Sequence, residues 1–232
     1  MKALIEVFYQ PGKLFASLPE RKFAWVAPLI AVALLTVLAF YLLPHYMGRE
    51  NLARQQMAMM ASRLSPEQMQ TAVEQANQPI RIYIGYASAF VGSAVSMLVL
   101  AGLLMAFGMM TKKAPGFGTM LAMVGLANFP YSLVTVLMTW LTLAISPDPT
   151  SLDFRNLLAT NVGAFMNKNE TSAGLYSLMT SLDLLTFVEI FLLSLGFSKV
   201  TKSGIGAGLG AVLVLWILWV FAKMGLALAF GN

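Results

Sequence analysis

Long runs of apolar residues alternate with short polar segments along the whole chain. Five runs are long enough to cross a bilayer core about 30 Å thick, which requires about 20 helical residues. They occupy residues 23–44, 82–110, 119–146, 178–200 and 205–230. The first three contain no charged residue, whereas the fourth contains Asp183 and Glu189 and the fifth contains Lys223. The pattern predicts an all-α fold, a polytopic membrane bundle of five transmembrane helices spanning residues 23–230.

The segments between these runs also carry helical patterns. Residues 1–22 combine apolar and charged positions around Pro11-Gly12, which predicts an amphipathic N-terminal element on the inner membrane surface. Residues 48–80 have apolar positions at helical spacing on both sides of the capping-box sequence Ser65-Pro66-Glu67-Gln68. This pattern predicts an extracytoplasmic helical hairpin. Residues 147–177 present another apolar helical face, which predicts an outer interfacial loop with a helix in it.

The basic residues between the runs indicate the orientation, because short cytoplasmic loops of membrane proteins are enriched in Lys and Arg. One side gathers eight basic residues in the N-terminal stretch and two tight loops: Lys2, Lys13, Arg21, Lys22, Lys112, Lys113, Lys199 and Lys202. The other side has six, spread over longer loops and mixed with acidic residues: Arg49, Arg54, Arg63, Arg81, Arg155 and Lys168. We expect an inner-membrane protein with a cytoplasmic N-terminus and an extracytoplasmic C-terminus.

The amino-acid composition excludes several classes of protein and of functional site. Of the 232 residues, 58% are hydrophobic and 11% are charged, whereas soluble domains have about 45–50% apolar and about 25% charged residues, so a soluble globular protein is excluded. The chain has no Cys and a single His, His45, which excludes thiolate chemistry and a His-centred triad. We expect no enzymatic activity, no cofactor and no metal. The net charge of +5 reflects the clusters between the runs and indicates topology rather than nucleic-acid binding.

Small residues line one face of the second run and open the fifth run. They are Gly85, Ala89, Gly92, Ser93 and Ser96 in the second run, and Gly204, Gly206, Gly208 and Gly210 in the fifth. Such residues let transmembrane helices approach closely, as in GxxxG pairs. These faces either pack inside the bundle or dock a partner, which includes a second copy of the chain.

Charged residues inside the runs are the main candidates for chemistry, because they are costly in hydrocarbon and often face the bundle interior or a polar pathway. At a rise of about 1.5 Å per residue, Asp183 and Lys223 lie about 25 Å and about 28 Å from the inner ends of their helices, so depth pairs Lys223 with Asp183 and not with Glu189. Glu189, at about 16 Å, is level with Asn128 in the third run, at about 15 Å. Pro130 and Tyr131 follow Asn128, and Pro130 frees a backbone carbonyl because it has no N–H.

The candidate intramembrane polar site therefore consists of Asn128, Pro130, Tyr131, Asp183, Glu189 and Lys223. In one interpretation Lys223 reaches the outer surface, Asp183 forms an ion pair, and Glu189 binds Asn128 as interhelical glue. In another, Glu189, Asn128 and Asp183 form a protonatable site for transport. A shared catalytic pair of carboxylates is disfavoured, because six residues along one helix rotate the two acids apart by about 240°.

Several short motifs, taken in order, resemble the YIP1 family of multi-pass membrane proteins, in particular its bacterial branch. The resemblance rests on Val7-Phe8 through Pro19, Trp25-Val26-Ala27-Pro28-Leu29, Ala127-Asn128-Phe129-Pro130-Tyr131, Leu182-Asp183-Leu184-Leu185-Thr186 and Leu195-Gly196-Phe197-Ser198. It implies a five-helix membrane domain without catalytic residues. Some bacterial members assist ABC-type export systems, so it also implies an accessory role beside an ABC exporter.

The leading expectation is a non-enzymatic integral membrane protein that binds other integral membrane proteins and assists an ABC-type export system. The expected partners are the lipid bilayer and other membrane proteins, with self-association also considered. One alternative is a small-solute or proton-coupled carrier that uses Glu189, Asn128 and Asp183. Another is lipid handling or membrane shaping by the amphipathic N-terminal element.

Overall fold

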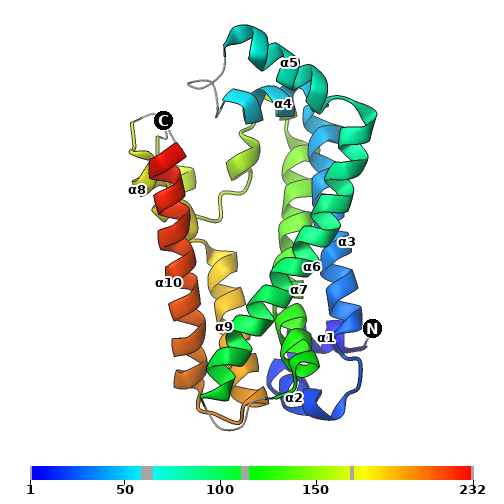
Figure 1. Ribbon diagram of the computed structural model, residues 1–232, viewed down its shortest axis with the longest axis vertical. Helices are drawn as coiled ribbons and strands as arrows, with labels where there is room; N and C mark the ends of the chain where they lie inside the picture. The colour runs from blue at the N-terminus through cyan, green and yellow to red at the C-terminus, as the bar shows by residue number, and fades with distance from the viewer. Residues whose placement is uncertain (1, 59–64, 111–114, 168–169, 231–232) are drawn as a thin grey trace. The chain divides into compact units, whose positions relative to one another are not determined.

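The computed structural model describes residues 2–58, 65–110, 115–167 and 170–230 (Figure 1). The regular elements in these ranges are helices. The chain folds as two compact units. Unit 1 comprises Met1–Leu35, Val91–Thr135 and Leu184–Trp219, and unit 2 comprises Thr36–Phe90, Val136–Asp183 and Val220–Asn232. The basic loop that contains Lys112 and Lys113, and residues 59–64 of the predicted outer hairpin, lie outside the described residues.

Four helices are long and apolar enough to cross a membrane: α3 (Val26–Met47), α6 (Pro79–Met109), α7 (Phe117–Ile145) and α10 (Ile205–Phe230). Their ends lie within three residues of the first, second, third and fifth predicted runs. The all-α class is therefore confirmed, and these helices fit a multi-pass membrane protein. In α7, 61% of the most apolar stretch is buried, against 17% in α6, so α7 is the most enclosed of the four.

The fourth predicted run, 178–200, is not one continuous helix. It is divided between α8 (Ala173–Ser181) and α9 (Leu184–Val200). At the break, the Val162 backbone N–H donates to the Leu182 carbonyl at 3.1 Å, and Asn161 and Asp183 form an isolated antiparallel bridge. Asp is a poor residue for a helix interior, because its side chain competes for local hydrogen bonds. The prediction of a single helix over 178–200 is therefore wrong at residues 182–183.

Unit 1 contains α1 (Lys2–Tyr9), α2 (Pro11–Ser17), the 3₁₀ turn η1 (Leu18–Glu20) and α9, together with parts of the long helices. Helix α2 packs against α9. Its Leu14 and Phe15 side chains are fully buried in the core of the unit. One face of the predicted amphipathic element is thus packed into the protein core, while Ile5 and Tyr9 of α1 remain exposed.

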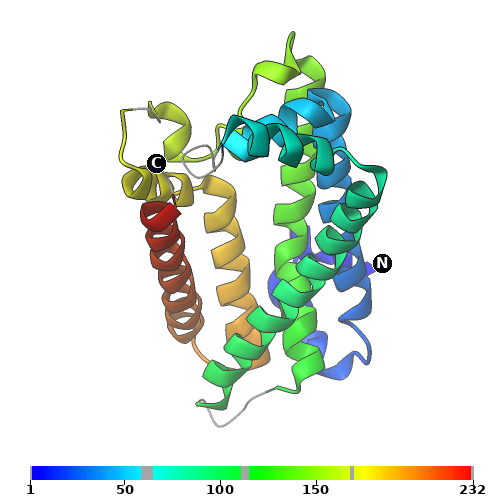
Figure 2. The same ribbon diagram turned by 45° about the horizontal axis from the view of Figure 1, so that its top comes forward.

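Unit 2 contains α4 (Arg49–Ala58), α5 (Pro66–Ala76) and α8. The predicted capping box at the start of α5 is confirmed: Ser65 Oγ accepts from the Gln68 N–H at 3.2 Å, and Gln68 Oε1 accepts from the Ser65 N–H at 2.9 Å. Helices α4 and α5 contact each other. In both Figures 1 and 2, α8 lies beside the C-terminal end of α10.

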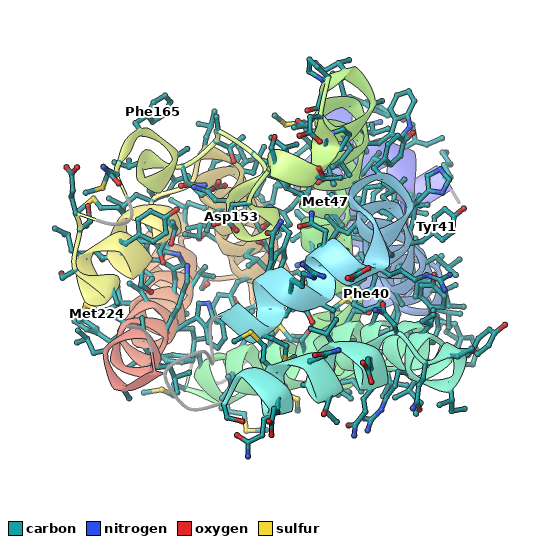
Figure 3. The ribbon with its side chains drawn as sticks, turned by 90° about the horizontal axis from the view of Figure 1, so that it is seen from above. Phe40, Tyr41, Met47, Asp153, Phe165 and Met224 are labelled. Atoms are coloured by element: carbon teal, nitrogen blue, oxygen red, sulfur yellow. The ribbon has the colours of Figure 1, made fainter. Side chains whose placement is uncertain are left out.

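Segment 147–177, predicted as an interfacial loop with a helix in it, begins without an α-helix. Its first part consists of three 3₁₀ turns, η3 (Pro149–Ser151), η4 (Phe154–Asn156) and η5 (Val162–Phe165), before α8 begins. The Asp148 and Asn161 side chains accept from backbone N–H groups at the starts of η3 and η5. Such local bonds compete with a continuous helix. Figure 3 shows the Phe165 side chain pointing away from the ribbon at η5, where it is 81% exposed.

Helix α4 and segment 147–177 of unit 2 are joined by hydrogen bonds. The Asn51 amide of α4 donates to the Thr150 carbonyl at 2.8 Å. One turn later, the Gln55 amide donates to the Leu152 carbonyl at 3.1 Å, and Gln55 Oε1 accepts from the Phe154 N–H at 3.3 Å. Because Asn51 and Gln55 are four residues apart, they present both side chains on one face of α4. That face holds the first turns of segment 147–177.

Candidate functional site

A chain of three polar side chains joins α7 and α9 within unit 1. The Asn128 side-chain amide donates to Glu189 Oε1 at 2.6 Å. The Ser132 hydroxyl, one turn further along α7, donates to Asn128 Oδ1 at 2.8 Å. The amide of Asn128 therefore uses its oxygen and its nitrogen at once. We refer to this arrangement as the Ser132–Asn128–Glu189 chain.

The local sequence of α7 explains this placement. Asn128 and Ser132 are four residues apart and so share one helix face. Pro130 lies between them, buried inside α7. Because it has no N–H, it cannot donate to the carbonyl of Leu126 four residues earlier. The helix nevertheless continues through Pro130, and Tyr131 is half-buried beside it.

Two glycines set the spacing of the helices near the chain. A Cβ at Gly196 in α9 would lie 2.6 Å from Met123 Cγ in α7, closer than real Cβ contacts allow. A Cβ at Gly125 would lie 3.0 Å from Pro28 Cβ in α3. Met123 precedes Asn128 by five residues and Gly196 follows Glu189 by seven, so this close approach brings the two polar side chains within reach.

The geometry allows the Ser132–Asn128–Glu189 chain two roles. A hydrogen bond contributes about 0.5–1.5 kcal/mol net to stability, so the bond from Asn128 to Glu189 can hold α7 against α9. Glu189 is only half-buried, and a carboxyl group within an apolar helix can also accept and release a proton. The first role requires only contacts that are present in unit 1.

Lys223 belongs to unit 2, where it meets the C-terminal end of α8. Its ammonium donates to Thr180 Oγ1 at 3.1 Å and to Ser181 Oγ at 3.2 Å. Both hydroxyls donate in turn to the Ser177 carbonyl, at 3.0 Å and 2.8 Å. A positive charge at a helix C-terminus is favourable, because the terminal carbonyls carry partial negative charge. Lys223 therefore caps α8 through two hydroxyl groups.

Asp183 follows directly after this end of α8. Its Oδ2 accepts from Thr160 Oγ1 at 2.6 Å. Asp183 and Lys223 attract each other electrostatically, while the hydrogen bonds of the ammonium go to Thr180 and Ser181. Depth along the helices therefore predicted that Lys223 lies near Asp183, but it did not predict that the ammonium donates to Thr180 and Ser181.

The six residues of the predicted polar site are divided between the two units. Asn128, Pro130, Tyr131 and Glu189 belong to unit 1, and Asp183 and Lys223 belong to unit 2. Sequence reasoning missed the hydroxyl groups that complete both clusters: Ser132, Thr160, Thr180 and Ser181. Ser132 could have been found from its spacing of four residues from Asn128. The others required knowledge of the break after α8.

The predicted small-residue faces are occupied in part. Gly208 of α10 lies directly against the Ser194 carbonyl of α9, and a Cβ at Gly85 of α6 would lie 2.8 Å from the Phe40 ring. Around Gly92, Gly204, Gly206 and Gly210, by contrast, a Cβ would meet nothing within 4 Å. Along the rest of the α6 face, Ala89 and Ser93 are half-buried and Ser96 is exposed.

Comparisons with known proteins give no relative for this chain: no family model, no curated protein and no solved structure matches it. Within the part of the chain that the structure describes, no group of three or more His, Cys, Asp or Glu side chains could hold a metal ion.

Proposed function

We propose that this protein is a non-enzymatic membrane accessory protein that binds other integral membrane proteins through one open face of α10. This face consists of Gly206, Gly210, Val214 and Ile217 and lies within unit 1. The observation that carries the proposal is the pair Gly206 and Gly210, around which a Cβ would meet nothing within 4 Å. Val214 and Ile217 are 45% and 43% exposed.

The start of α10 has small residues on two sides. At about 100° per residue, Gly206 and Gly210 lie about 40° apart, whereas Gly208 points about 200° away from Gly206. Gly208 meets α9. Small residues therefore line two sides of α10, and one of these sides packs against α9. On the other side, a Cβ at Gly206 or Gly210 would meet no described residue within 4 Å.

This face of α10 is better suited to contact with another helix than with lipid. Glycine lowers helix stability by about 1 kcal/mol relative to alanine, and lipid chains gain nothing from its missing side chain. A second transmembrane helix gains close backbone contact from it. The partner can be another membrane protein or a second copy of the chain, and the resemblance to the YIP1 family favours an ABC exporter as the first candidate.

The proposed topology has five transmembrane spans: the four long helices α3, α6, α7 and α10, and in addition α9. The 17 residues of α9 extend about 25 Å,, close to the thickness of a bilayer core. We propose a cytoplasmic N-terminus and an extracytoplasmic C-terminus in the inner membrane, because the basic residues are concentrated in the N-terminal stretch and short loops,. Helices α4 and α5 then form the outer hairpin.

Crosslinking and affinity purification from native membranes test the docking proposal. The parent protein should recover an integral membrane partner, or a second copy of itself, in fixed stoichiometry. The double variant Gly206→Leu/Gly210→Leu should lose this partner. Gly102→Leu is the matched control, because a Cβ at Gly102 on α6 would also meet nothing within 4 Å. Equal recovery with the double variant, or no partner with the parent, would refute the proposal.

A proton-coupled carrier function is the second candidate, and the half-buried Glu189 carboxyl bonded to Asn128 favours it. Asp183 is not required in this version, because it has its own partner, Thr160, in unit 2. Purified protein in liposomes should then move protons, Glu189→Gln should abolish the flux, and Glu20→Gln should leave it unchanged. Parent protein that moves no protons would dismiss this candidate.

A further inference from the structure

We propose that unit 1 carries a binding surface for anionic phospholipids, formed by the α1–α2 segment and the end of α9. Its cationic part is Lys13, Lys22 and Lys199, and its apolar part is Ile5, Tyr9 and Phe23. The surface is independent of the proposed docking face on α10. It would fix unit 1 at the boundary between headgroups and acyl chains.

The cations come from distant parts of the sequence and meet at one end of unit 1. A Cβ at Gly12, next to Lys13, would lie 3.9 Å from Cε of Lys199. The packing of α2 against α9 therefore brings the Lys199 side chain to the residue next to Lys13. Lys22 precedes α3 by four residues and Lys199 lies in the last turn of α9. All three are exposed.

Charge at this end of the unit is strongly positive. Residues 2–25 and 199–204 contain six Lys and Arg residues and two Glu residues. One of these acids, Glu6, is 7% exposed and already forms ion pairs with Arg21 at 3.2 Å and with Lys2 at 3.6 Å. The other acid of these segments, Glu20, is outnumbered by Lys13, Lys22, Lys199 and Lys202, so most of the anionic charge that complements these cations must come from outside these segments. Basic residues near a membrane attract anionic lipids.

The apolar part of the surface lies further along the unit. Phe8 of α1 packs edge-on against Phe129 of α7, with ring centroids 6.1 Å apart. Phe129 is 12 residues, or about 18 Å, beyond the start of α7 at Phe117. Helix α1 thus contacts α7 toward the apolar middle of that helix. Its Ile5 and Tyr9 remain 65% and 62% exposed.

Phe23 adds a second apolar contact close to the cations. Its side chain is 74% exposed, and its backbone has φ 57°. A left-handed conformation is unfavourable for a non-glycine residue. The Phe23 ring itself is mostly uncovered by the rest of the protein. Acyl chains at the interface would cover it. Cations beside exposed apolar side chains fit a lipid that has an anionic head and hydrocarbon tails.

Spin-labelled lipids in reconstituted vesicles test this surface. In equimolar phosphatidylcholine and phosphatidylglycerol, the fraction of each labelled lipid immobilised by the protein gives its relative affinity. We expect the parent to prefer phosphatidylglycerol, and Lys13→Gln/Lys199→Gln to lower this preference about two- to fivefold. Raised salt should also lower it in the parent, because salt screens exposed charges.

The control is Arg49→Gln/Arg81→Gln, which removes two exposed charges from unit 2. It should keep the preference of the parent. An equal loss in both double variants would mean that only net charge matters, and it would overturn the proposed site. A parent protein that holds both lipids equally would overturn it as well. Circular dichroism of each variant ensures that only folded protein is compared.

Discussion

Gly208 of α10 lies directly against the backbone carbonyl of Ser194 in α9, where no Cβ can be accommodated. The Ser194 hydroxyl is turned back along its own helix and donates to the Ile190 carbonyl at 2.7 Å. The contact between the two helices is therefore made by backbone on both sides. Small residues permit such close approach of helix backbones in membrane bundles.

Gly208→Ala should destabilise the protein, because the added methyl group must push α9 and α10 apart. Overpacking of this kind costs about 1–3 kcal/mol. Thermal unfolding in detergent should show a clearly lower midpoint. Gly206→Ala serves as the matched control, since its methyl group would enter open space. A midpoint for Gly208→Ala equal to that of the control would contradict the observed contact.

Asn128→Ala should also lower stability, because it leaves the Glu189 carboxyl without its amide donor. Loss of a partner for a buried or half-buried polar group costs about 1–3 kcal/mol. Glu189→Gln should cost less, because its side-chain oxygen can still accept from Asn128. In the double variant Asn128→Ala/Glu189→Ala the two single losses should not add, since each substitution alone removes the same bond. Additive losses, measured by chemical unfolding, would show that the two side chains act separately.

Lys223→Met should loosen α8, because the methionine keeps the apolar stem but cannot donate to Thr180 and Ser181. Favourable charges at helix ends contribute about 0.3–1 kcal/mol, and up to about 2 kcal/mol when partly buried. Hydrogen exchange of the α8 amides should become faster, while exchange in α9 should not change. Arg81→Met, which removes an exposed charge of unit 2, should leave α8 exchange at the parental rate.

Phe23→Gly should stabilise the protein in neutral detergent by up to about 1 kcal/mol, because glycine adopts positive φ without strain. Phe23→Ala removes the same ring but keeps the strained backbone, so it should give no such gain. In vesicles that contain phosphatidylglycerol, the advantage of the glycine variant should disappear if the ring inserts among lipid chains. Unfolding midpoints of the three proteins in both environments decide this point.

The long helices could be predicted from the sequence because their signal is local. Each of α3, α6, α7 and α10 is a run of apolar residues bounded by polar ones, and the capping box of Ser65 and Gln68 also lies within four residues. The interruption between α8 and α9 could not be predicted in this way. It depends on the pairing of Leu182 with Val162, twenty residues earlier, and apolar patterning contains no information about such a pairing.

The contacts of the candidate site could also be predicted only in part. Depth along the helices placed Asn128 level with Glu189, and the two side chains are in contact. The same reasoning paired Lys223 with Asp183 alone, because it treated α8 and α9 as one straight helix. The end of α8 supplies hydroxyl acceptors at that level. Side-chain partners at a helix end become visible only when the end itself is known.

The shortness of α9 has a consequence for the surrounding bilayer. A helix of 17 residues covers about 25 Å,, several ångströms less than the average hydrocarbon thickness of about 30 Å. If α9 crosses the bilayer as proposed, the lipids along it would have to compress or shorten, and the membrane would be thinned on that flank. A locally thinned bilayer would favour short-chain lipids beside α9. It would also lower the free-energy cost for another short helix to lie next to α9.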